Sequence, residues 1–199
     1  MLRRGRPVER QGRHAGQRRA EYLGAVARAH SLQGPVMKLE GSCHCRGVRF
    51  SVETHHPSPF MRCYCSVCRK TQGGGGFAIN LSGDARSLKV RGRQHVKVYR
   101  ARIQNPEDAK AHQSKGQRHF CGRCGSALWL YDPRWPELIH PFASAIDTPL
   151  PEAPELVHIM LEFKPDWVPV HAGKKDKKFQ RYPKESIAEW HQRHDAEVG

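Results

Sequence analysis

Apolar and polar residues alternate in three short segments in the middle of the chain. The segments are 48–52 (VRFSV), 77–81 (FAINL) and 96–99 (VKVY). A period of two places one side of an extended chain against a core and leaves the other side in solvent. Each segment therefore predicts a half-buried β-strand.

Two further segments are more continuously apolar. Residues 127–131 (ALWLY) predict a central strand, buried on both faces, and residues 157–163 (VHIMLEF) predict another strand. Only 185–198 has the helical spacing of three and four, at Ile187, Trp190 and His194. With 14 prolines and 18 glycines between these segments, the chain predicts a mostly β domain with a short C-terminal helix.

The first 36 residues lack such a pattern and predict a disordered basic N-terminus. They contain eight arginines, no lysine and two acidic residues. Three interpretations are open: an extension upstream of a start at Met37, which we favour, a targeting peptide, or a nucleic-acid-binding arm. We expect the folded domain at 37–183 and a helical tail at 184–199.

Two polar segments lie inside the expected domain. Residues 101–117 have no apolar periodicity and predict a mobile loop ahead of the last cysteine pair. Residues 174–184 (KKDKKFQRYPK) predict a solvated surface, with a patch for phosphate or an acidic ligand as the alternative.

Composition narrows the class of protein. No apolar run is long enough to span a membrane and no secretory signal is visible, so we expect a cytoplasmic protein with no membrane partner. The formal charge of +15 is partly that of the N-terminal segment, and the basic residues are not interleaved with aromatic ones, which does not favour nucleic acid as a partner. Phosphate-loop, dinucleotide, nucleophile-elbow and deaminase motifs are all absent from the sequence.

The seven cysteines lie in three tight clusters, which are Cys43-x-Cys45, Cys63-x-Cys65-x-x-Cys68 and Cys121-x-x-Cys124. An odd number in such spacing indicates metal binding rather than disulfides. Zinc prefers four tetrahedral ligands, so the two pairs predict one closed four-thiolate site, in which Gly122 and Gly125 allow positive φ. The triplet is then left as a second site, which gives two Zn²⁺ per chain.

A site with three protein ligands and an open fourth position is typical of catalytic zinc. A histidine is the alternative fourth ligand, and it would make the triplet a closed structural site. The possible donors are His44, His95, His112 and His119. Sequence reasoning leaves the open and closed forms equally supported.

Residues 69–77 (RKTQGGGGF) follow the triplet directly. A plain turn is the simpler interpretation of the four glycines. Beside an open metal site, however, such a run lets backbone N–H groups approach a bound anion, and Arg69 and Lys70 raise the local positive potential.

Three motifs together resemble the family of glutathione-dependent formaldehyde-activating enzymes, which also includes centromere protein V. They are GSCHCRGVRF, CYCSVCRKTQG and RHFCGRCGSAL, and the resemblance runs from about Lys38 to about Pro183. It implies a small zinc-pinned (β-tent-like) assembly of sheets. It also implies that Cys43, Cys45, Cys121 and Cys124 hold a structural zinc, and that Cys63, Cys65 and Cys68 hold an exchangeable, catalytic one.

The implied activity is that of a zinc-dependent carbon–sulfur lyase, which joins glutathione and formaldehyde into S-hydroxymethylglutathione. Its partners would be a small thiol such as glutathione and a small aldehyde. Tyr64, Ser66 and His119 are candidate proton donors. The alternative is a non-catalytic, zinc-stabilised binding module for chromatin or another polyanion, as in centromere protein V.

Overall fold

The computed structural model describes residues 36–72, 74–104 and 109–198. The chain divides into two compact units, one formed by Gly34–Lys184 and the other by Met1–Gln33 with Glu185–Gly199. The predictions for residues 1–35 lie outside the described residues. The larger unit contains all the sheets and all seven cysteines.

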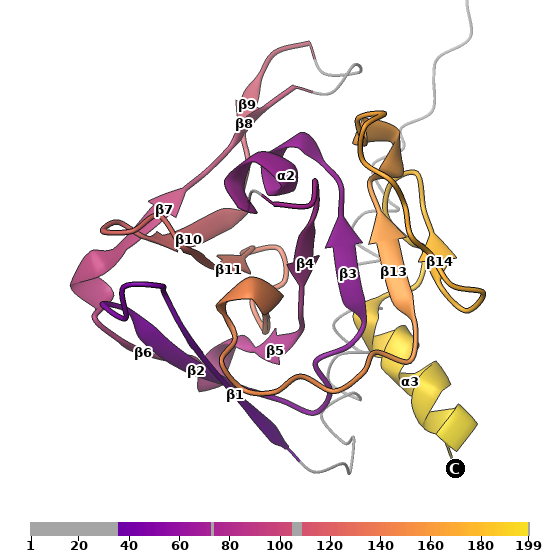
Figure 1. The fold of residues 1–199 in the computed structure, drawn as a ribbon, viewed down its shortest axis with the longest axis horizontal. Helices are drawn as coiled ribbons and strands as arrows, with labels where there is room; N and C mark the ends of the chain where they lie inside the picture. The colour runs from indigo at the N-terminus through magenta and orange to yellow at the C-terminus, as the bar shows by residue number, and fades with distance from the viewer. Residues whose placement is uncertain (1–35, 73, 105–108, 199) are drawn as a thin grey trace, which may run out of the picture. The chain divides into compact units, whose positions relative to one another are not determined.

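A three-stranded antiparallel sheet lies at the start of the larger unit (Figure 1). It has the order β1-β2-β6 and is made of β1 (Met37–Ser42), β2 (Arg49–Thr54) and β6 (Lys89–Arg91). Phe50 and Val52 of β2 are buried, while Arg49 and Glu53 are exposed. The alternation in segment 48–52 therefore forms the half-buried strand that it predicts.

A five-stranded antiparallel sheet has the order β5-β12-β11-β10-β7. Its strands are β5 (Gly83–Asp84), β12 (Leu138–Pro141), β11 (Ala127–Tyr131), β10 (Gln117–Cys121) and β7 (Val96–Tyr99). The expectation of a central strand at 127–131 is confirmed, because β11 lies in the middle and Leu128 and Trp129 are buried.

The remaining strands form a four-stranded and a two-stranded sheet. The first has the order β14-β13-β3-β4, with β14 (Lys177–Lys178), β13 (Leu156–Ile159), β3 (Phe60–Cys63) and β4 (Ala78–Asn80). β13 runs parallel to both of its neighbours, so β3 is positioned by a segment almost a hundred residues later in the chain. The two-stranded sheet pairs β8 (Arg102–Ile103) with β9 (His112–Gln113).

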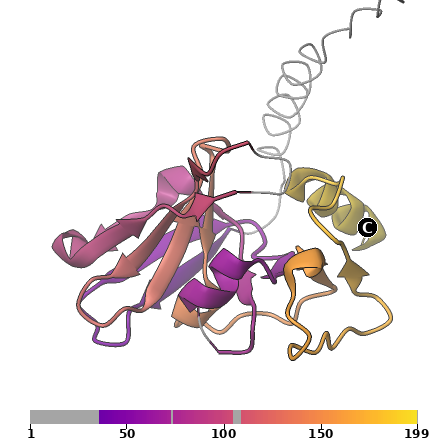
Figure 2. The ribbon, with the colours of Figure 1, turned by 90° about the horizontal axis from the view of Figure 1, so that it is seen from above.

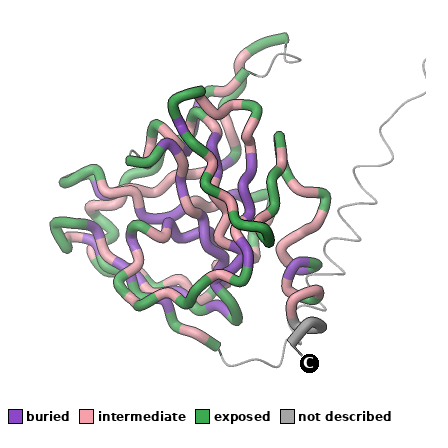
Figure 3. The backbone as a smooth tube through the Cα atoms, turned by 45° about the vertical axis from the view of Figure 1, so that its right-hand side comes forward, coloured by how far each residue is buried: buried purple, intermediate pink, exposed green. Residues whose placement is uncertain are grey.

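The main core lies between the three-stranded and five-stranded sheets. The Phe50 ring of β2 meets the Trp129 ring of β11 edge to face, with their centroids 5.1 Å apart. Leu39, Leu128 and Ile139 complete this buried layer. Figure 2 shows the two sheets as successive layers, and Figure 3 shows the buried stretches that they enclose. Cys43 and Cys121 are part of this same buried core, so the cysteine pairs that contain them adjoin it directly.

The predicted C-terminal helix is present as α3 (Ile187–Val198), in the smaller unit. It begins with a capping box, since the Ser186 hydroxyl accepts from the Glu189 N–H at 3.2 Å and the Glu189 carboxylate accepts from the Ser186 N–H at 2.7 Å. The expectation that no other segment is helical is wrong. The helix α2 (Ser66–Gln72) includes the last cysteine of the triplet, and a seven-residue helix is too short to show apolar periodicity.

Two other expectations need correction. The strand predicted at 157–163 ends at Ile159, because Met160 has a positive φ of 62° and a 3-10 turn follows at Leu161–Phe163. The loop predicted at 101–117 contains the β8–β9 hairpin, while its residues 105–108 lie outside the described part.

No helix within residues 36–72, 74–104 and 109–198 is both long enough and apolar enough to span a membrane.

His140 of β12 provides a test of this fold through its titration. Its ring is buried, Nδ1 donates to the Leu81 carbonyl at 3.1 Å, and burial lowers its pKa. Below about pH 6.5 the unfolded chain takes up a proton that the folded chain resists, so stability falls as the pH falls. The slope attributable to this group is at most about 1.4 kcal/mol per pH unit.

His140→Asn keeps a donor near the Nδ1 position but does not titrate. We expect the free energy of unfolding to fall less steeply between pH 6.5 and 5.5 in this variant than in the natural chain. Urea unfolding at several pH values measures this, and His171→Asn, at an exposed position, is the control. Parallel curves for all three proteins would contradict the assignment.

Candidate metal centres

Four cysteines from two distant turns meet beside the core. The sulfurs of Cys43, Cys45, Cys121 and Cys124 all lie within 4.8 Å of one another. Cys43 and Cys121 are buried, whereas Cys45 and Cys124 are exposed. The group therefore has a buried side in the core and an outer side in solvent.

Each pair is held by a tight, hydrogen-bonded turn. In the first, the Val48 N–H donates to the Cys43 sulfur at 3.2 Å. In the second, the Gly125 N–H donates to the Cys121 carbonyl at 2.8 Å, and Gly125 has the positive φ of 76° that favours glycine. Gly122 does not have a positive φ, which corrects one expectation. A Cβ there would lie 2.8 Å from Lys97 Cγ, so close packing is the constraint at that position.

The sulfur spacing fits a tetrahedral zinc ion. A Zn–S distance of about 2.3 Å places the ligands of a regular tetrahedron about 3.8 Å apart. The Cys43 and Cys45 sulfurs are 3.5 Å apart, and those of Cys45 and Cys121 are 3.8 Å apart. The donor set and the sulfur spacing are thus compatible with a bound zinc ion.

The thiols of this group have different pKa values in the absence of a metal ion. Burial raises the pKa of the Cys43 thiol to about 11. The Ser126 hydroxyl, 3.2 Å from the Cys124 sulfur, lowers the pKa of Cys124 to about 5. A buried thiol of high pKa ionises readily only beside a positive charge, and a divalent metal supplies that charge.

The triplet forms a second group at the start of α2. Cys63 ends β3, Cys65 precedes the helix and Cys68 lies within it, and their sulfurs are within 4.8 Å of one another. The Cys65 sulfur caps the helix, because it accepts from the Cys68 N–H at 3.3 Å. Cys63 and Cys68 are buried and Cys65 is partly exposed, so Cys65 lies on the side of the group that solvent reaches.

Arg118 supplies positive charge to the triplet. Its Nη2 donates to the Cys68 sulfur at 3.6 Å, across from β10. Hydrogen bonds from the Cys63 and Cys68 thiols, and then the Arg118 charge, lower the pKa of Cys65. Sequence reasoning did not select Arg118, because an arginine 50 residues beyond Cys68 gives no local signal.

The fourth position of the triplet has no protein ligand in the described part of the chain. No described histidine, aspartate or glutamate has a ligand atom within 4.8 Å of all three sulfurs. His44, His95, His112 and His119 thus lie outside both sulfur groups. The geometry favours the open form of the site over the form closed by histidine.

The three expected proton donors lie in different places. The Tyr64 hydroxyl is buried and bonded to His158 Nδ1 at 2.9 Å, and His119 stacks on Trp129 in the five-stranded sheet. Neither interaction points these groups to the triplet. Ser66 is exposed at the first turn of α2 and is the remaining candidate among the three.

Tyr182 is subject to the charge of the triplet, and sequence reasoning did not select it. Although the residue is 66% exposed, the protein around its hydroxyl and then the negative charge of Cys63, Cys65 and Cys68 raise its pKa to about 12. Its phenol therefore keeps its proton at neutral pH. Tyr182 lies in the lysine-rich segment 174–184, where no pattern distinguishes it from a solvated side chain.

The segment after the triplet is only partly as expected. α2 extends through Arg69 and Lys70 to Gln72, and Gly74 and Gly75 are exposed. Gly76 has a φ of 84°, and a Cβ there would lie 2.3 Å from Val168 Cγ2. Both the positive φ and the close packing therefore require glycine at this position.

The sequence matches the model of a known protein family. The model of the family "Glutathione-dependent formaldehyde-activating enzyme" matches residues 38–162. The chain belongs to this family. The matched residues include both sulfur groups and Arg118.

One relative is named "Putative glutathione-dependent formaldehyde-activating enzyme" and comes from Halomonas elongata. It is 61% identical over 163 residues, which cover 82% of this chain and all of the relative. A crystal structure of a Rhodobacter sphaeroides protein is 26% identical and covers 58% of this chain and 92% of that one, with a TM-score of 0.41.

We expect two zinc ions per chain, with different effects on folding. Cys121→Ser removes a buried ligand that is part of the core, so it should abolish cooperative folding or lower stability by several kcal/mol. Cys65→Ser should leave a folded protein with one zinc. Elemental analysis and thermal unfolding measure both effects.

The two serine variants control each other, because the chemical change is the same. A folded Cys121→Ser protein that retains two zinc ions would contradict the four-sulfur assignment. Global unfolding of Cys65→Ser would mean that the triplet is also a structural site.

Proposed function

We propose that the chain is a zinc-dependent enzyme of the carbon–sulfur lyase type, acting on glutathione and formaldehyde or a related small aldehyde. The observation that carries this proposal is the three-sulfur group, which no other described ligand residue completes. Membership of the family supports the choice of substrates.

Cys63, Cys65 and Cys68 would hold the catalytic zinc, and Cys43, Cys45, Cys121 and Cys124 the structural zinc. A zinc with three thiolate ligands supplies Lewis-acid chemistry that keeps a further thiol in its anionic form. Arg118, which contacts Cys68, offsets part of the negative charge that three thiolates bring to the site.

The reaction joins the glutathione sulfur to the aldehyde carbon. As the carbon–sulfur bond forms, the electron pair of the C=O bond moves to oxygen, and that oxygen then takes a proton. The reverse sequence breaks the carbon–sulfur bond and returns the thiol and the aldehyde. Because thiols add to formaldehyde without a catalyst, the protein contributes mainly by proximity and by proton transfer.

We assign the proton transfer to Tyr182. The alkoxide oxygen is more basic than a phenolate, so a phenol can protonate it, and the negative charge of the three sulfurs acts on the pKa of Tyr182. It is exposed, so it can exchange its proton with water after each turnover. Tyr64, in contrast, is buried and bonded to His158.

We further propose a cytoplasmic location. All seven cysteines lack disulfide partners, and two clusters need their thiols reduced for metal binding. A reducing compartment maintains that state.

Glutathione should add one sulfur neighbour to one of the two zinc ions. Zinc X-ray absorption spectra of the two-zinc protein, recorded with and without glutathione, measure the mean number of sulfur ligands. One site with four sulfurs and one with three give a mean of 3.5. We expect this mean to rise toward 4 as glutathione adds a sulfur at the triplet, while the four-sulfur site stays unchanged. S-methylglutathione, which has no free thiol, is the matched control.

An unchanged spectrum at saturating glutathione would overturn the catalytic proposal. Salt-dependent binding of DNA together with an unchanged spectrum would instead support the alternative, a binding module for polyanions.

Tyr182→Phe should slow the adduct exchange without weakening substrate binding. Loss of a general acid costs at least about 100-fold in rate, with KM changed by less than roughly twofold. Two-dimensional exchange NMR of glutathione and its hydroxymethyl adduct measures the rate above the uncatalysed background. Tyr99→Phe, an exposed tyrosine on β7, is the control. Equal rates for the two variants would exclude Tyr182 as the donor.

A further inference from the structure

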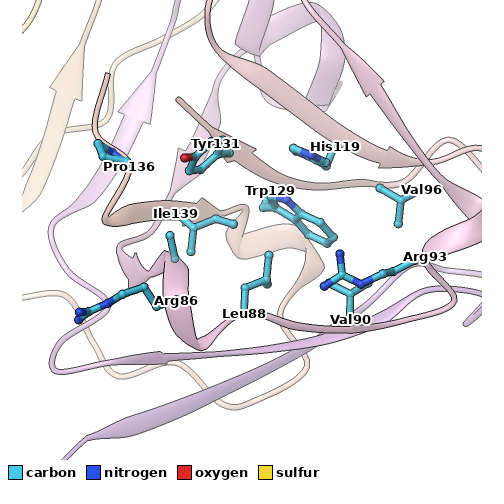
Figure 4. Close-up of a pocket in the computed structure, with 11 residues that line it drawn as sticks. Arg86, Leu88, Val90, Arg93, Val96, His119, Trp129, Tyr131, Pro136 and Ile139 are labelled. Carbon is cyan, nitrogen blue, oxygen red and sulfur yellow. The ribbon is translucent and has the colours of Figure 1, made fainter. Parts of the chain in front are cut away.

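A cavity of about 500 Å³ lies between the three-stranded and five-stranded sheets of the larger unit. Its walls come from β6 and the two 3-10 turns beside it, and from β7, β10, β11 and β12 (Figure 4). A volume of this size is in the range of small-molecule sites. The function proposed above uses none of the residues that line it.

The walls are mainly apolar and aromatic. Val90, Ile139 and Trp129 line the centre, and the His119 ring stacks on Trp129 with the centroids 5.0 Å apart. Trp129 also packs edge to face against Phe50, with the ring centroids 5.1 Å apart. The aromatic wall is therefore fixed by packing before any ligand binds, which lowers the entropic cost of binding.

The charge of the cavity is positive. Arg86 and Arg93 are the charged residues in its lining, and no acidic residue lines it. The Arg86 guanidinium is bonded to the Asp84 carboxylate at 2.9 and 3.1 Å, so its charge is offset. The Arg93 carbonyl accepts from the Val96 N–H, but its guanidinium makes no hydrogen bond or ion pair with any described residue, and Figure 4 shows that guanidinium beside Val90 and Trp129.

The turn that carries Arg93 is firmly anchored. Arg93 begins the 3-10 turn Arg93–His95, whose last residue accepts from the Gly122 N–H at 2.7 Å. The preceding Gly92 has a φ of 77°, and a Cβ there would lie 1.9 Å from the Gly47 carbonyl oxygen. Only glycine permits this approach, so the backbone of the turn is held against the first cysteine turn.

The cavity and the triplet lie on opposite faces of β10. Arg118 and His119 are neighbours on this strand, and neighbouring side chains in a strand point to opposite faces. Arg118 contacts Cys68, whereas His119 lines the cavity. A ligand in the cavity is thus separated from the triplet by the thickness of the sheet.

We propose that this cavity binds a small organic carboxylate that carries an aliphatic or aromatic group. The carboxylate pairs with the Arg93 guanidinium, whose two N–H groups match its two oxygens. The apolar group lies against Val90, Trp129 and Ile139. At the other end Tyr131 presents a hydroxyl that bonds to no described residue, so a polar substituent can be accommodated there.

Phenylacetate is a probe of this chemistry, and 2-phenylethanol and 2-phenylethylamine are matched neutral and cationic controls. The protein is used as the full chain with both zinc ions bound. Nitrogen–proton NMR spectra resolve one indole signal for each of the four tryptophans, and triple-resonance spectra assign that of Trp129. We expect phenylacetate to shift the Trp129 signal with a dissociation constant on the order of 1 mM.

The expected result is that the alcohol and the amine bind at least tenfold more weakly than phenylacetate. Arg93→Gln should weaken phenylacetate binding at least tenfold, because a charge-assisted hydrogen bond is lost. Arg91→Gln, an exposed arginine on β6 that does not line the cavity, should bind as the natural chain does.

Equal affinity for the three probes would overturn the proposal, since it would mean apolar binding without charge recognition. Phenylacetate binding that is unchanged in Arg93→Gln, or absent at 20 mM of the probe, would also overturn it. Glutathione serves as a third comparison. If glutathione displaced phenylacetate from the Trp129 site, the cavity would be part of the thiol-binding site and the proposal of a separate site would be wrong.

Discussion

The approach of four sulfurs from two turns is the constraint on which the larger unit depends. Cys45 and Cys121 are 76 residues apart in the chain, yet their sulfurs are 3.8 Å apart. Cys43 and Cys121 are part of the apolar core between the two antiparallel sheets. Thiolates are costly to bury unless a cation compensates them, so a metal at this point would fasten the two sheets together and make their packing depend on it.

β10 transmits this constraint to the rest of the molecule. Cys121 ends the strand, Arg118 near its start contacts Cys68 of the triplet, and His119 between them faces the cavity. Because consecutive side chains of a strand point to opposite faces, one anchored strand positions a residue for each site without bringing the sites together. The chemistry proposed for the triplet thus depends on the correct placement of β10, the strand that ends at the four-sulfur group.

Local patterns predicted part of this arrangement. The strand at 127–131 and the helix at the C-terminus follow from periodicity, and the cysteine spacing separates the two sulfur groups. α2 was missed because a helix of seven residues is too short to show apolar periodicity. Arg118 and Tyr182 were missed because each is far from the triplet in the sequence and acts on it only through the tertiary fold, a property that no short window contains.

The cavity, too, could not be predicted from local sequence patterns. Its lining comes from segments between Ala85 and Ile139, and each residue has an ordinary local explanation as a core or surface side chain. Arg93 becomes notable only when the fold shows that it lacks a partner beside an apolar wall, whereas Arg86 has one in Asp84. The position of Arg93 depends on Gly92, whose close contact with the Gly47 carbonyl fixes the turn. Gly47 lies two residues after Cys45 and belongs to the first cysteine turn. The geometry of that turn therefore also determines where the Arg93 guanidinium lies in the cavity.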